Sequence, residues 1–356
     1  MMLQMMDGRV IIQKHTDQKY TTYFDQNSGL FVRKEDKDSE EPFWSEDGPE
    51  LLDISITNYC ERSCTFCYRH SDKKGKHISK SDFQYIIEQA TELGVLQIAL
   101  GGGNPNQHPQ FIEFLKLVRE HNIIPSYTTN GEGLSHDILK ASADYCGAIA
   151  ISLYSNNVQC ITETLEKISN YSIKTNVHLI LKADTIDFAT EWLLNPPAFF
   201  KYVNAIIFLN YKPINKQLKV SVNDLSKMES FFRIASECKH VKIGFDSCCV
   251  SGIVKWMKAY PFFVESCEAA RFSAFISEEM KMYPCSFMAN TPNYGDLKKQ
   301  SIIEIWKLNN AFINHRNSIL HNSCKSCDFN DICNGGCCFM PEINFCKKDK
   351  IISDGQ

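Results

Sequence analysis

The stretch Cys60–Cys67, with the sequence CERSCTFC, decides how the rest of the chain is interpreted. It places three thiols, Cys60, Cys64 and Cys67, directly after an apolar, strand-like run at 51–57. Thiolates at this spacing are ligands of iron–sulfur clusters and of zinc. A [4Fe–4S] cluster has four irons, so three cysteines leave one iron open to a further ligand. The spacing alone predicts a metal site and leaves the metal undecided.

Composition narrows the class of protein. At 356 residues, 44% hydrophobic and 22% charged, the chain has the make-up of a soluble globular protein, with no apolar run long enough to span a bilayer. Residues 1–9 lack the basic-then-apolar pattern of a signal peptide, so we expect a cytoplasmic location. A net charge of −4 gives no electrostatic footprint for nucleic acid. Neither a nucleic acid nor a membrane is expected as a partner.

Sixteen cysteines in a chain without an export signal indicate metal ligation rather than disulfides. Three lie in the opening stretch, and ten lie between Cys248 and Cys346. The other three, Cys146, Cys160 and Cys238, are expected to be small buried apolar residues. A disulfide-rich C-terminal region remains an alternative, but it requires an oxidising compartment that the N-terminus does not indicate.

From about residue 51 onward, strand-like and helix-like patterns alternate. Six strands each followed by a helix predict a parallel sheet with right-handed crossovers and with chemistry at the carboxyl ends of the strands. Ser79, Ser135 and Asp187 are expected to begin helices. The candidate strands are 52–57, 96–100, 123–128, 148–153, 175–182 and 203–209, and the candidate helices are 79–93, 109–121, 134–143, 158–170 and 185–194. A helix at 222–238 and a strand at 241–245 are expected to follow.

The opening stretch resembles the CxxxCxφC signature of radical S-adenosylmethionine (SAM) enzymes, in which φ is aromatic and is Phe66 here. The resemblance implies a partial (β/α)6 barrel over about residues 50–235 and a [4Fe–4S] cluster on the three cysteines. In that family SAM chelates the open iron through its amino and carboxylate groups. Reductive cleavage of SAM then yields methionine and a 5′-deoxyadenosyl radical, which abstracts a hydrogen atom from the substrate. Phe66 is implied to lie at the cofactor.

Residues after the strands extend this resemblance. Gly101–Pro105 is similar to the family's GGEP element, which holds the SAM amino group through backbone carbonyls, although Asn104 replaces the usual Glu. Cofactor contacts are thereby implied for Gly102, Gly103, Asn104 and Pro105. Two later strand ends are similar to the family's TNG and SLDG elements, with Tyr154 in place of the Asp, and imply contacts from Thr129, Asn130 and Ser152. Leu209 ends the sixth strand, where the family often packs an apolar residue on the adenine. Ordinary turn chemistry is the alternative for the two hydroxyl residues and for Asn130.

The C-terminal cysteines follow the spacing CxxCxxxxxCxxxC from Cys324 to Cys337. This pattern resembles the SPASM extension of radical SAM enzymes that modify peptides and proteins, and it covers about residues 247–350. The resemblance implies two auxiliary [4Fe–4S] clusters. The distal one would use Cys324, Cys327, Cys333 and Cys346, and the proximal one Cys267, Cys285 and Cys337. Cys248 or Cys249 is a candidate for its fourth ligand, an open iron is the alternative, and Cys338 is expected to be a bystander.

Before this stretch, residues 9–35 predict an antiparallel cap with strands at 10–12, 20–24 and 30–32. The cap is expected either to cover the bottom of the barrel or to bind a peptide by adding a strand to its edge. We therefore predict three domains: a cap at 1–48, a radical SAM barrel at 49–238 and a SPASM-like domain at 239–356.

The resemblance implies an oxidative modifier of a ribosomally made precursor peptide or of a protein, with thioether or carbon–carbon cross-linking as the outcome. An auxiliary cluster is a physically sensible acceptor for the electron that must leave when the new bond forms. A flavodoxin- or ferredoxin-type protein would supply electrons to the first cluster. Asp246, beside Cys248, is a candidate general base.

Other functions remain open. Formylglycine formation on a sulfatase, and epimerisation with a hydrogen-donor thiol such as Cys248, are alternative reactions. A non-catalytic iron–sulfur partner that binds peptides is an alternative of another class, favoured by Asn104 and Tyr154 where acids are expected. The two cysteine motifs together argue against zinc.

Overall fold

The computed structural model describes residues 2–6, 10–35, 42–154, 158–213, 222–257 and 264–346. The chain divides into two compact units. The first unit joins Met1–Ile149 to Ala269–Asn314, and the second joins Ala150–Glu268 to His315–Gln356. This division by contacts differs from the domain boundaries drawn from the sequence, which stay a prediction.

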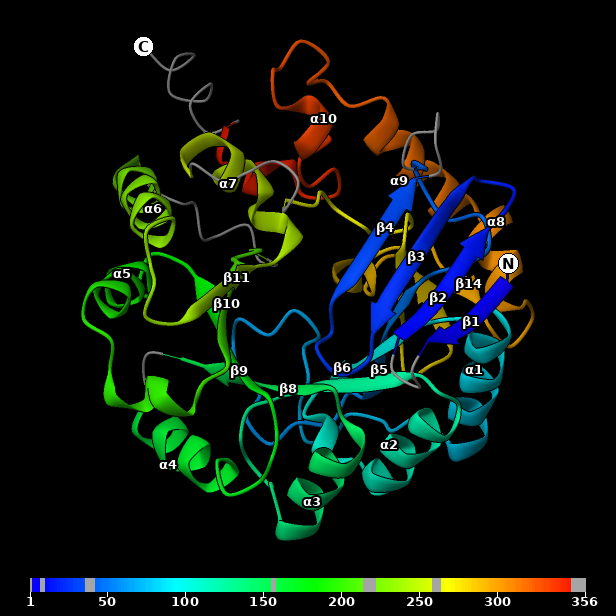
Figure 1. The fold of residues 1–356 in the computed structure, drawn as a ribbon, viewed down its shortest axis with the longest axis horizontal. Helices are drawn as coiled ribbons and strands as arrows, with labels where there is room; N and C mark the ends of the chain where they lie inside the picture. Colours follow the sequence, from blue (N-terminus) through cyan, green and yellow to red (C-terminus); the bar gives the residue numbers. More distant parts are fainter. Residues whose placement is uncertain are drawn as a thin grey trace. The chain divides into compact units, whose positions relative to one another are not determined.

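The first unit begins with an antiparallel sheet in the order β1-β2-β3-β4 (Figure 1). Its strands are β1 (Met2–Met6), β2 (Val10–His15), β3 (Tyr20–Asp25) and β4 (Phe31–Glu35). Three of them were predicted, and β1 was missed because its sequence, MLQMM, has neither β-branched nor aromatic residues. Ile11 and Phe24 form a buried cluster with Leu96 and Ile124, which lie at the beginnings of neighbouring parallel strands. The cap therefore packs against the amino ends of those strands.

Three parallel strands of the first unit carry the opening cysteine stretch. They are β5 (Leu51–Thr57), β6 (Gln97–Gly102) and β7 (Ile124–Thr129), in the order β7-β6-β5. Helices α1 (Lys80–Glu92), α2 (Phe111–Glu120) and α3 (His136–Tyr145) follow them, and the short η1 (Pro105–Gln107) follows β6 (Figure 1). The Ser79 side chain accepts from Asp82 N and the Ser135 side chain from Ile138 N, which confirms both predicted helix starts.

Alternation along β5 separates its two faces. Leu52, Ile54 and Ile56 are fully buried, while the opposite face carries Asp53 and Ser55. Asp53 and Ser55 therefore lie on the same face of the sheet as Thr57, the last residue of β5. The loop that carries Cys60, Cys64 and Cys67, called the cysteine loop below, follows Thr57.

The second segment of this unit extends the same sheet beyond β5. Strand β12 (Ser273–Ile276) runs parallel to β5, and β13 (Lys281–Tyr283) and β14 (Gly295–Asp296) continue antiparallel. The segment also contains η5 (Ser286–Met288) and α8 (Ile302–Leu308). Trp306, fully buried in α8, donates from Nε1 to the Ser45 carbonyl at 2.7 Å. Part of the predicted SPASM-like region thus completes the sheet that bears the first cysteines.

In the second unit, β9 (Thr175–Leu181), β10 (Ala205–Asn210) and β11 (Lys242–Phe245) form a parallel ladder. Strand β8 (Ala148–Leu153) crosses the boundary between the units, as does α9 (Asn310–Leu320). The helices are α4 (Val158–Ile168), α5 (Ile186–Leu194), α6 (Val222–Ala235), α7 (Val250–Trp256) and α10 (Asn330–Cys333), with the short turns η2 (Ala198–Tyr202), η3 (Ser247–Cys249) and η6 (Pro341–Ile343). The six predicted strands and the helices between them are all present.

Two local expectations were wrong. Thr185, not Asp187, precedes α5, and Asp187 lies in the first turn, where its charge favours the helix dipole. Cys160, expected to be buried, is exposed because it lies outside the buried stripe of α4 formed by Ile161, Leu165 and Ile168. Cys146 and Cys238, for which burial was also expected, are half-buried.

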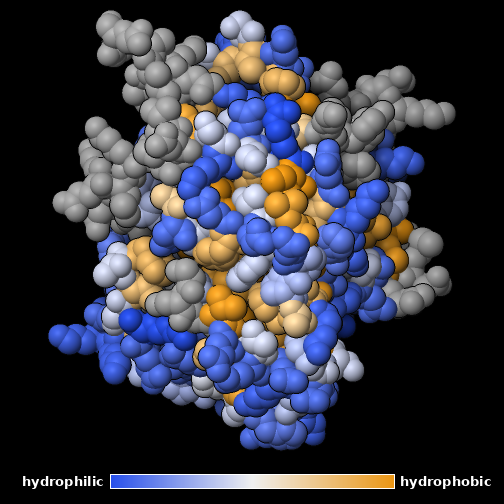
Figure 2. Space-filling model, turned by 90° about the vertical axis from the view of Figure 1, so that its left-hand side faces the viewer, coloured by the Kyte–Doolittle hydropathy of each residue, from blue (hydrophilic) through white to orange (hydrophobic). Residues whose placement is uncertain are grey.

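The part of the chain that the structure describes contains no helix long and apolar enough to cross a membrane. On the face drawn in Figure 2, groups of hydrophobic residues are separated by hydrophilic ones.

Candidate functional site

The cysteine loop is fixed by its own backbone. Cys60 N donates to the Asp72 carbonyl at 2.9 Å, which ties the loop's beginning to its end. Cys67 N donates to the Cys64 carbonyl at 3.0 Å, so these two cysteines flank a tight turn. Ser63 has a positive φ of 46° just before that turn. The three thiols are free and half-buried, and all are held on one short loop.

The electrostatics show that the three thiols lie together. Burial raises the pKa of Cys64, and the neighbouring Cys60 and then Cys67 raise it further. Arg62 opposes this shift, and its Nε lies 2.6 Å from Glu132 Oε1. Among the described residues, no group of three His, Cys, Asp or Glu side chains was found that could hold a metal ion. The three thiols are near enough for Cys60 and Cys67 to affect Cys64, and in an iron–sulfur cluster such ligands bind different irons.

Glycines allow two other segments to pack directly against the backbone of residues 57–59, where the cysteine loop begins. A Cβ at Gly103 would lie 2.0 Å from the Tyr59 carbonyl oxygen, and one at Gly75 would lie 1.9 Å from the Asn58 oxygen. Gly102 has a φ of +115° and would clash with the Thr57 carbonyl. The glycines after β6 therefore have a packing role against the cysteine loop, and Gly75, which the sequence analysis missed, has the same role from the other side.

Asn104 connects this glycine turn to the end of β7. It is almost fully buried, and its Oδ1 accepts from Thr129 Oγ1 at 2.8 Å and from Asn130 N at 3.3 Å. Its Nδ2 donates to the Glu132 carbonyl at 3.2 Å. A glutamate carboxylate could not make this last bond, because it has no proton to donate. The neighbours of Asn104 thus explain why an amide, and not a carboxylate, stands at this position.

Asn130 connects the hydrogen bonds around Asn104 to the cysteine loop. Its Nδ2 donates to Cys60 Sγ at 3.8 Å, and its Oδ1 accepts from Glu132 N at 2.8 Å. Asn106, which was not predicted, donates to the Glu132 carbonyl at 2.7 Å and lies 2.6 Å from Thr129 Oγ1. Its position two residues after Asn104 in a strand-end turn was the available signal. Pro105 is buried in η1 and Phe66 is half-buried on the loop.

The remaining candidate contacts belong to the second unit. Ser152 in β8 and Leu209 in β10 are half-buried. Asp246 Oδ2 lies 2.7 Å from Lys212 Nζ, and its Oδ1 accepts from Asn210 N at 3.1 Å. Both carboxylate oxygens therefore have partners, and the general-base role stays a prediction. Lys212, in the strand-end segment after β10, is buried and was not singled out from the sequence.

Four of the C-terminal cysteines lie together. Burial raises the pKa of Cys333 to about 11, and Cys346, Cys324 and then Cys327 contribute to the rise. Cys327 N donates to the Cys324 carbonyl at 2.9 Å, and Gly336 N donates to the Cys333 carbonyl at 2.9 Å. These are the four cysteines that the resemblance assigned to the distal cluster.

The second unit also contains Cys248 and Cys337, which interact with each other. A hydrogen bond with Cys337 is the main cause of the raised pKa of Cys248, followed by burial. Cys249 is fully buried, and its Sγ lies 3.8 Å from the Phe208 carbonyl. Of the two adjacent candidates, Cys248 is the one that contacts a proposed proximal ligand.

The other C-terminal cysteines occupy separate surroundings. Cys267 belongs to the second unit, and Cys285 precedes η5 in the first. Cys338 Sγ lies 3.7 Å from the ring of His315. All sixteen cysteines fall within the described residues, and the structure assigns none of them to a disulfide, so the disulfide alternative has no support there.

Two family models match the chain. Residues 54–189 match the Radical SAM superfamily, and residues 267–328 match SPASM, an iron–sulfur cluster-binding domain. The chain thus carries a segment that matches the radical SAM superfamily, followed by a segment that matches the SPASM domain. A radical SAM domain implies a [4Fe–4S] cluster and SAM, and a SPASM domain implies auxiliary iron–sulfur clusters. The cofactors expected from the sequence are thereby confirmed at this level, and zinc is set aside.

Sequence relatives match shorter stretches. The chain is 30% identical over 95 residues to a PqqA peptide cyclase of Gluconobacter oxydans, covering 26% of each protein. It is 24% identical over 193 residues to a probable GTP 3′,8-cyclase of Methanocaldococcus jannaschii, covering 50% of this chain and 64% of that protein. The chain thus spans less than two thirds of the length of these relatives.

Among solved structures, the fold is similar to that of SuiB of Streptococcus suis bound to S-adenosylmethionine. The TM-score is 0.71 at 14% sequence identity, and the match covers 94% of this chain and 95% of SuiB. The predicted fold class, a partial (β/α)6 barrel with an N-terminal β cap and a cysteine-rich C-terminal region, is confirmed.

Proposed function

We propose that this protein is a radical SAM maturase that oxidatively modifies a ribosomally made precursor peptide. The observation that carries the proposal is the presence of two kinds of cysteine set in one chain: three thiols on the loop after β5 and four around Cys333. The SPASM match and the relation to a PqqA peptide cyclase support a peptide as the substrate.

In this proposal Cys60, Cys64 and Cys67 hold the first cluster, and SAM binds its open iron. When bound, the cluster and SAM together supply a 5′-deoxyadenosyl radical for hydrogen abstraction. The protein's part is to fix the loop, through the Asn104 and Asn130 network, and to surround the cofactor. The residues proposed to contact it are Phe66, Gly102, Gly103, Asn104, Pro105, Thr129, Asn130, Ser152 and Leu209.

The auxiliary ligands follow from the same proposal. Four ligands close a cluster, which can then pass electrons without binding substrate. The distal set is Cys324, Cys327, Cys333 and Cys346, and the proximal set is Cys267, Cys285, Cys337 and Cys248. The contact between Cys248 and Cys337 favours Cys248 over Cys249 for the fourth position. Asp246 remains a candidate base, once released from Lys212.

The proposal includes partners and location. A small flavodoxin- or ferredoxin-type protein supplies electrons, and the reaction takes place in the cytoplasm. The product is a thioether or carbon–carbon cross-link, with formylglycine formation and epimerisation as the other outcomes of the test below.

A nucleotide substrate is the second candidate. It is favoured by the similarity to a probable GTP 3′,8-cyclase, which extends over half of the chain. The SPASM match lies outside the residues matched to the Radical SAM superfamily and is the feature that favours a peptide.

The test is anaerobic incubation of the reconstituted protein with SAM, dithionite and a peptide encoded beside its gene, followed by mass spectrometry. A cross-link removes two hydrogens and leaves the product unreactive toward a carbonyl reagent. The same loss with carbonyl reactivity means formylglycine made from serine, and one deuterium gained in heavy water means epimerisation. Turnover of GTP in place of the peptide would contradict the proposal, as would peptide modification that survives loss of iron.

A further inference from the structure

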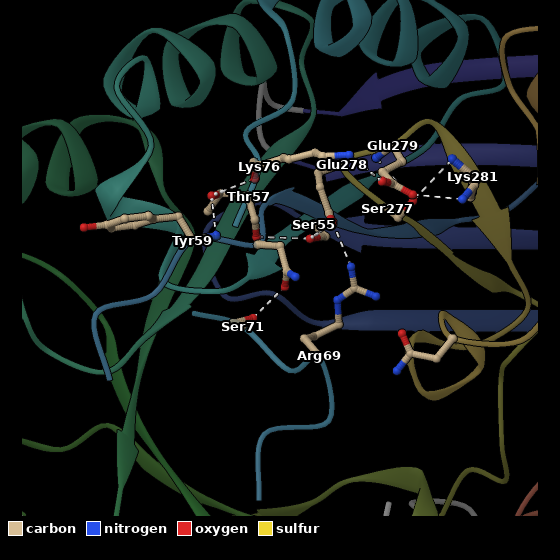
Figure 3. Close-up of polar contacts among 12 residues, drawn as sticks. Ser55, Thr57, Tyr59, Arg69, Ser71, Lys76, Ser277, Glu278, Glu279 and Lys281 are labelled. Atoms are coloured by element: carbon tan, nitrogen blue, oxygen red, sulfur yellow. Dashed lines mark hydrogen bonds and ion pairs between the residues drawn. The ribbon is translucent and has the colours of Figure 1, made fainter. Parts of the chain in front are cut away.

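A buried ion pair joins the cysteine loop to the hairpin that leads to Cys285. Arg69, two residues after Cys67, donates from a terminal guanidinium nitrogen to Glu278 Oε2 at 2.8 Å. The two side chains are only 5% and 7% exposed. Glu278 lies in the turn between β12 and β13, 209 residues away in the sequence. Figure 3 shows the two side chains pointing toward each other across this distance in sequence.

The strand that precedes the cysteine loop takes part in the same contact. Ser55 Oγ in β5 donates to the same Glu278 oxygen at 2.7 Å (Figure 3). The Arg69 guanidinium also lies 5.2 Å from the centre of the Phe275 ring in β12. Its Nε is buried without a hydrogen-bond partner, so the side chain is held by Glu278 and by packing. The Glu278 carboxylate therefore accepts hydrogen bonds from both sides of the cysteine loop: from Ser55 in the strand before it and from Arg69 just after Cys67.

The residue between Cys67 and Arg69 makes a second connection. The Tyr68 ring stacks on Phe287 with centroids 4.4 Å apart. Its carbonyl accepts from Asn290 Nδ2 at 3.3 Å. Phe287 lies two residues after Cys285, so the residue next to Cys67 packs on a residue close to Cys285.

We propose that Arg69 and Glu278 are positioning residues that fix the SAM-cluster loop against the segment bearing the auxiliary ligand Cys285. The proposal rests on the function proposed above, because it assumes one cluster on Cys60, Cys64 and Cys67 and an auxiliary cluster that includes Cys285. The pair sets the direction in which Cys67 presents its thiolate, and hence the orientation of the cluster face that binds SAM.

The ion pair is a device for geometry rather than for stability. Taking two charges out of water costs about as much as their attraction returns, so apolar residues of similar size can replace such a pair without loss of stability. An apolar replacement would, however, remove the fixed direction of the hydrogen bond. Stability and geometry can therefore be separated by experiment.

The test is the double variant Arg69→Met/Glu278→Leu, compared with Lys76→Met/Glu279→Leu. Lys76 and Glu279 form an ion pair between the same two segments at 3.2 Å, but they are 75% and 42% exposed. Each protein is purified anaerobically and reconstituted. The measurements are iron content, thermal midpoint, the electron paramagnetic resonance spectrum of the reduced protein with and without SAM, and 5′-deoxyadenosine formation.

For the buried pair, we expect wild-type iron content and thermal midpoint, but loss of the spectral change that SAM produces. 5′-Deoxyadenosine formation falls by about tenfold or more, since a misplacement of about 1 Å can cost ~10² in rate. The exposed pair behaves as wild type. Equal behaviour of the two double variants would overturn the proposal.

If the buried double variant does not fold, Arg69→Lys decides. A lysine retains the charge and can reach Glu278, so the proposal predicts that the spectral response to SAM is retained. Loss of that response in well-folded Arg69→Lys would overturn the proposal. A wild-type protein without iron, or without SAM cleavage, would instead refute the function proposed above.

Discussion

The loop after β5 and the array around Cys333 both gather cysteines, but they gather different numbers of them. The first has three thiols, of which Cys64 is affected by the other two. The second has four, of which Cys333 is affected by the other three. Because a cube has four irons, a cluster on the first set would leave a position for SAM, and a cluster on the second set would leave none. In the proposed function, the number of cysteine ligands therefore distinguishes the active-site cluster from the electron-transfer cluster.

A buried asparagine lies beside each region: one next to the three-thiol loop, the other next to Cys337, a proposed proximal ligand four residues after Cys333. Asn104 joins the glycine turn to the end of β7 beside the first set. Asn344, fully buried, accepts from Cys337 N at 2.8 Å and donates to the Gly335 and Cys337 carbonyls at 3.2 Å. An amide suits both places because it donates and accepts at once. Buried amides thus hold the backbone near both groups of cysteines.

The largest expected effect comes from removing the three-thiol set. Replacement of Cys60, Cys64 and Cys67 by Ala should reduce 5′-deoxyadenosine formation to background, because no ligand remains for the cluster that binds SAM. Chromatography of anaerobic reactions with SAM and dithionite measures this. Cys160→Ala, on the exposed face of α4, is the matched control and should leave the rate unchanged.

Removing one thiol of the four-thiol set should separate the two roles. In Cys333→Ala, SAM cleavage continues while peptide modification is lost, since the electron released on bond formation has no acceptor. Assaying 5′-deoxyadenosine and modified peptide in the same reaction tests this. Parallel loss of both products would show that the two cysteine sets do not have distinct functions.

The asparagines should have intermediate effects. Asn104→Ala and Asn344→Ala each leave buried hydrogen-bonding groups without partners, at a cost of about 1–3 kcal/mol per group. We expect a lower thermal midpoint in both variants, with loss of the first cluster's spectrum in one and of an auxiliary spectrum in the other. Unchanged midpoints would mean that the asparagines do not support the loops.

The sequence predicted these sites unevenly, for a physical reason. Spacing on a single loop identified the three-thiol set, because Cys60, Cys64 and Cys67 need only local structure to meet. It also grouped Cys324, Cys327 and Cys333, which are close in sequence. Side chains joined by the fold were missed: nothing in the sequence pairs Arg69 with Glu278 or sets Gly75 against Asn58. Such contacts depend on strand order, which hydrophobic periodicity does not encode.

Asn104 illustrates the same limit at one residue. As a departure from the resembled motif it weakened the sequence-based inference, whereas the structure shows it bonded to Thr129 and to the Glu132 carbonyl. The reason for Asn in place of Glu at position 104 became clear only once its hydrogen-bond partners were known. Strand and helix positions were predicted well, since they follow from local patterns of apolar residues.

The smallest expected effect concerns a carboxyl on β5. Burial raises the pKa of Asp53 to about 7, with Arg69 opposing the rise and Tyr68 close by. The folded chain therefore holds a proton that the unfolded chain releases, and stability falls as pH rises from about 4 to 7. Asp53→Asn should remove this fall and stabilise the protein above pH 7 by about 1 kcal/mol or more, since one pKa unit corresponds to ~1.4 kcal/mol. Denaturation at several pH values tests it, and parallel curves for the two proteins would contradict it.

The most direct test of the central claim is the iron and sulfide content of anaerobically purified protein, with the Cys60, Cys64 and Cys67 triple variant in parallel. The account predicts about twelve irons and as many sulfides per chain, falling by about four in the variant. Zinc without sulfide, or a wild-type iron content that the triple variant retains in full, would contradict it.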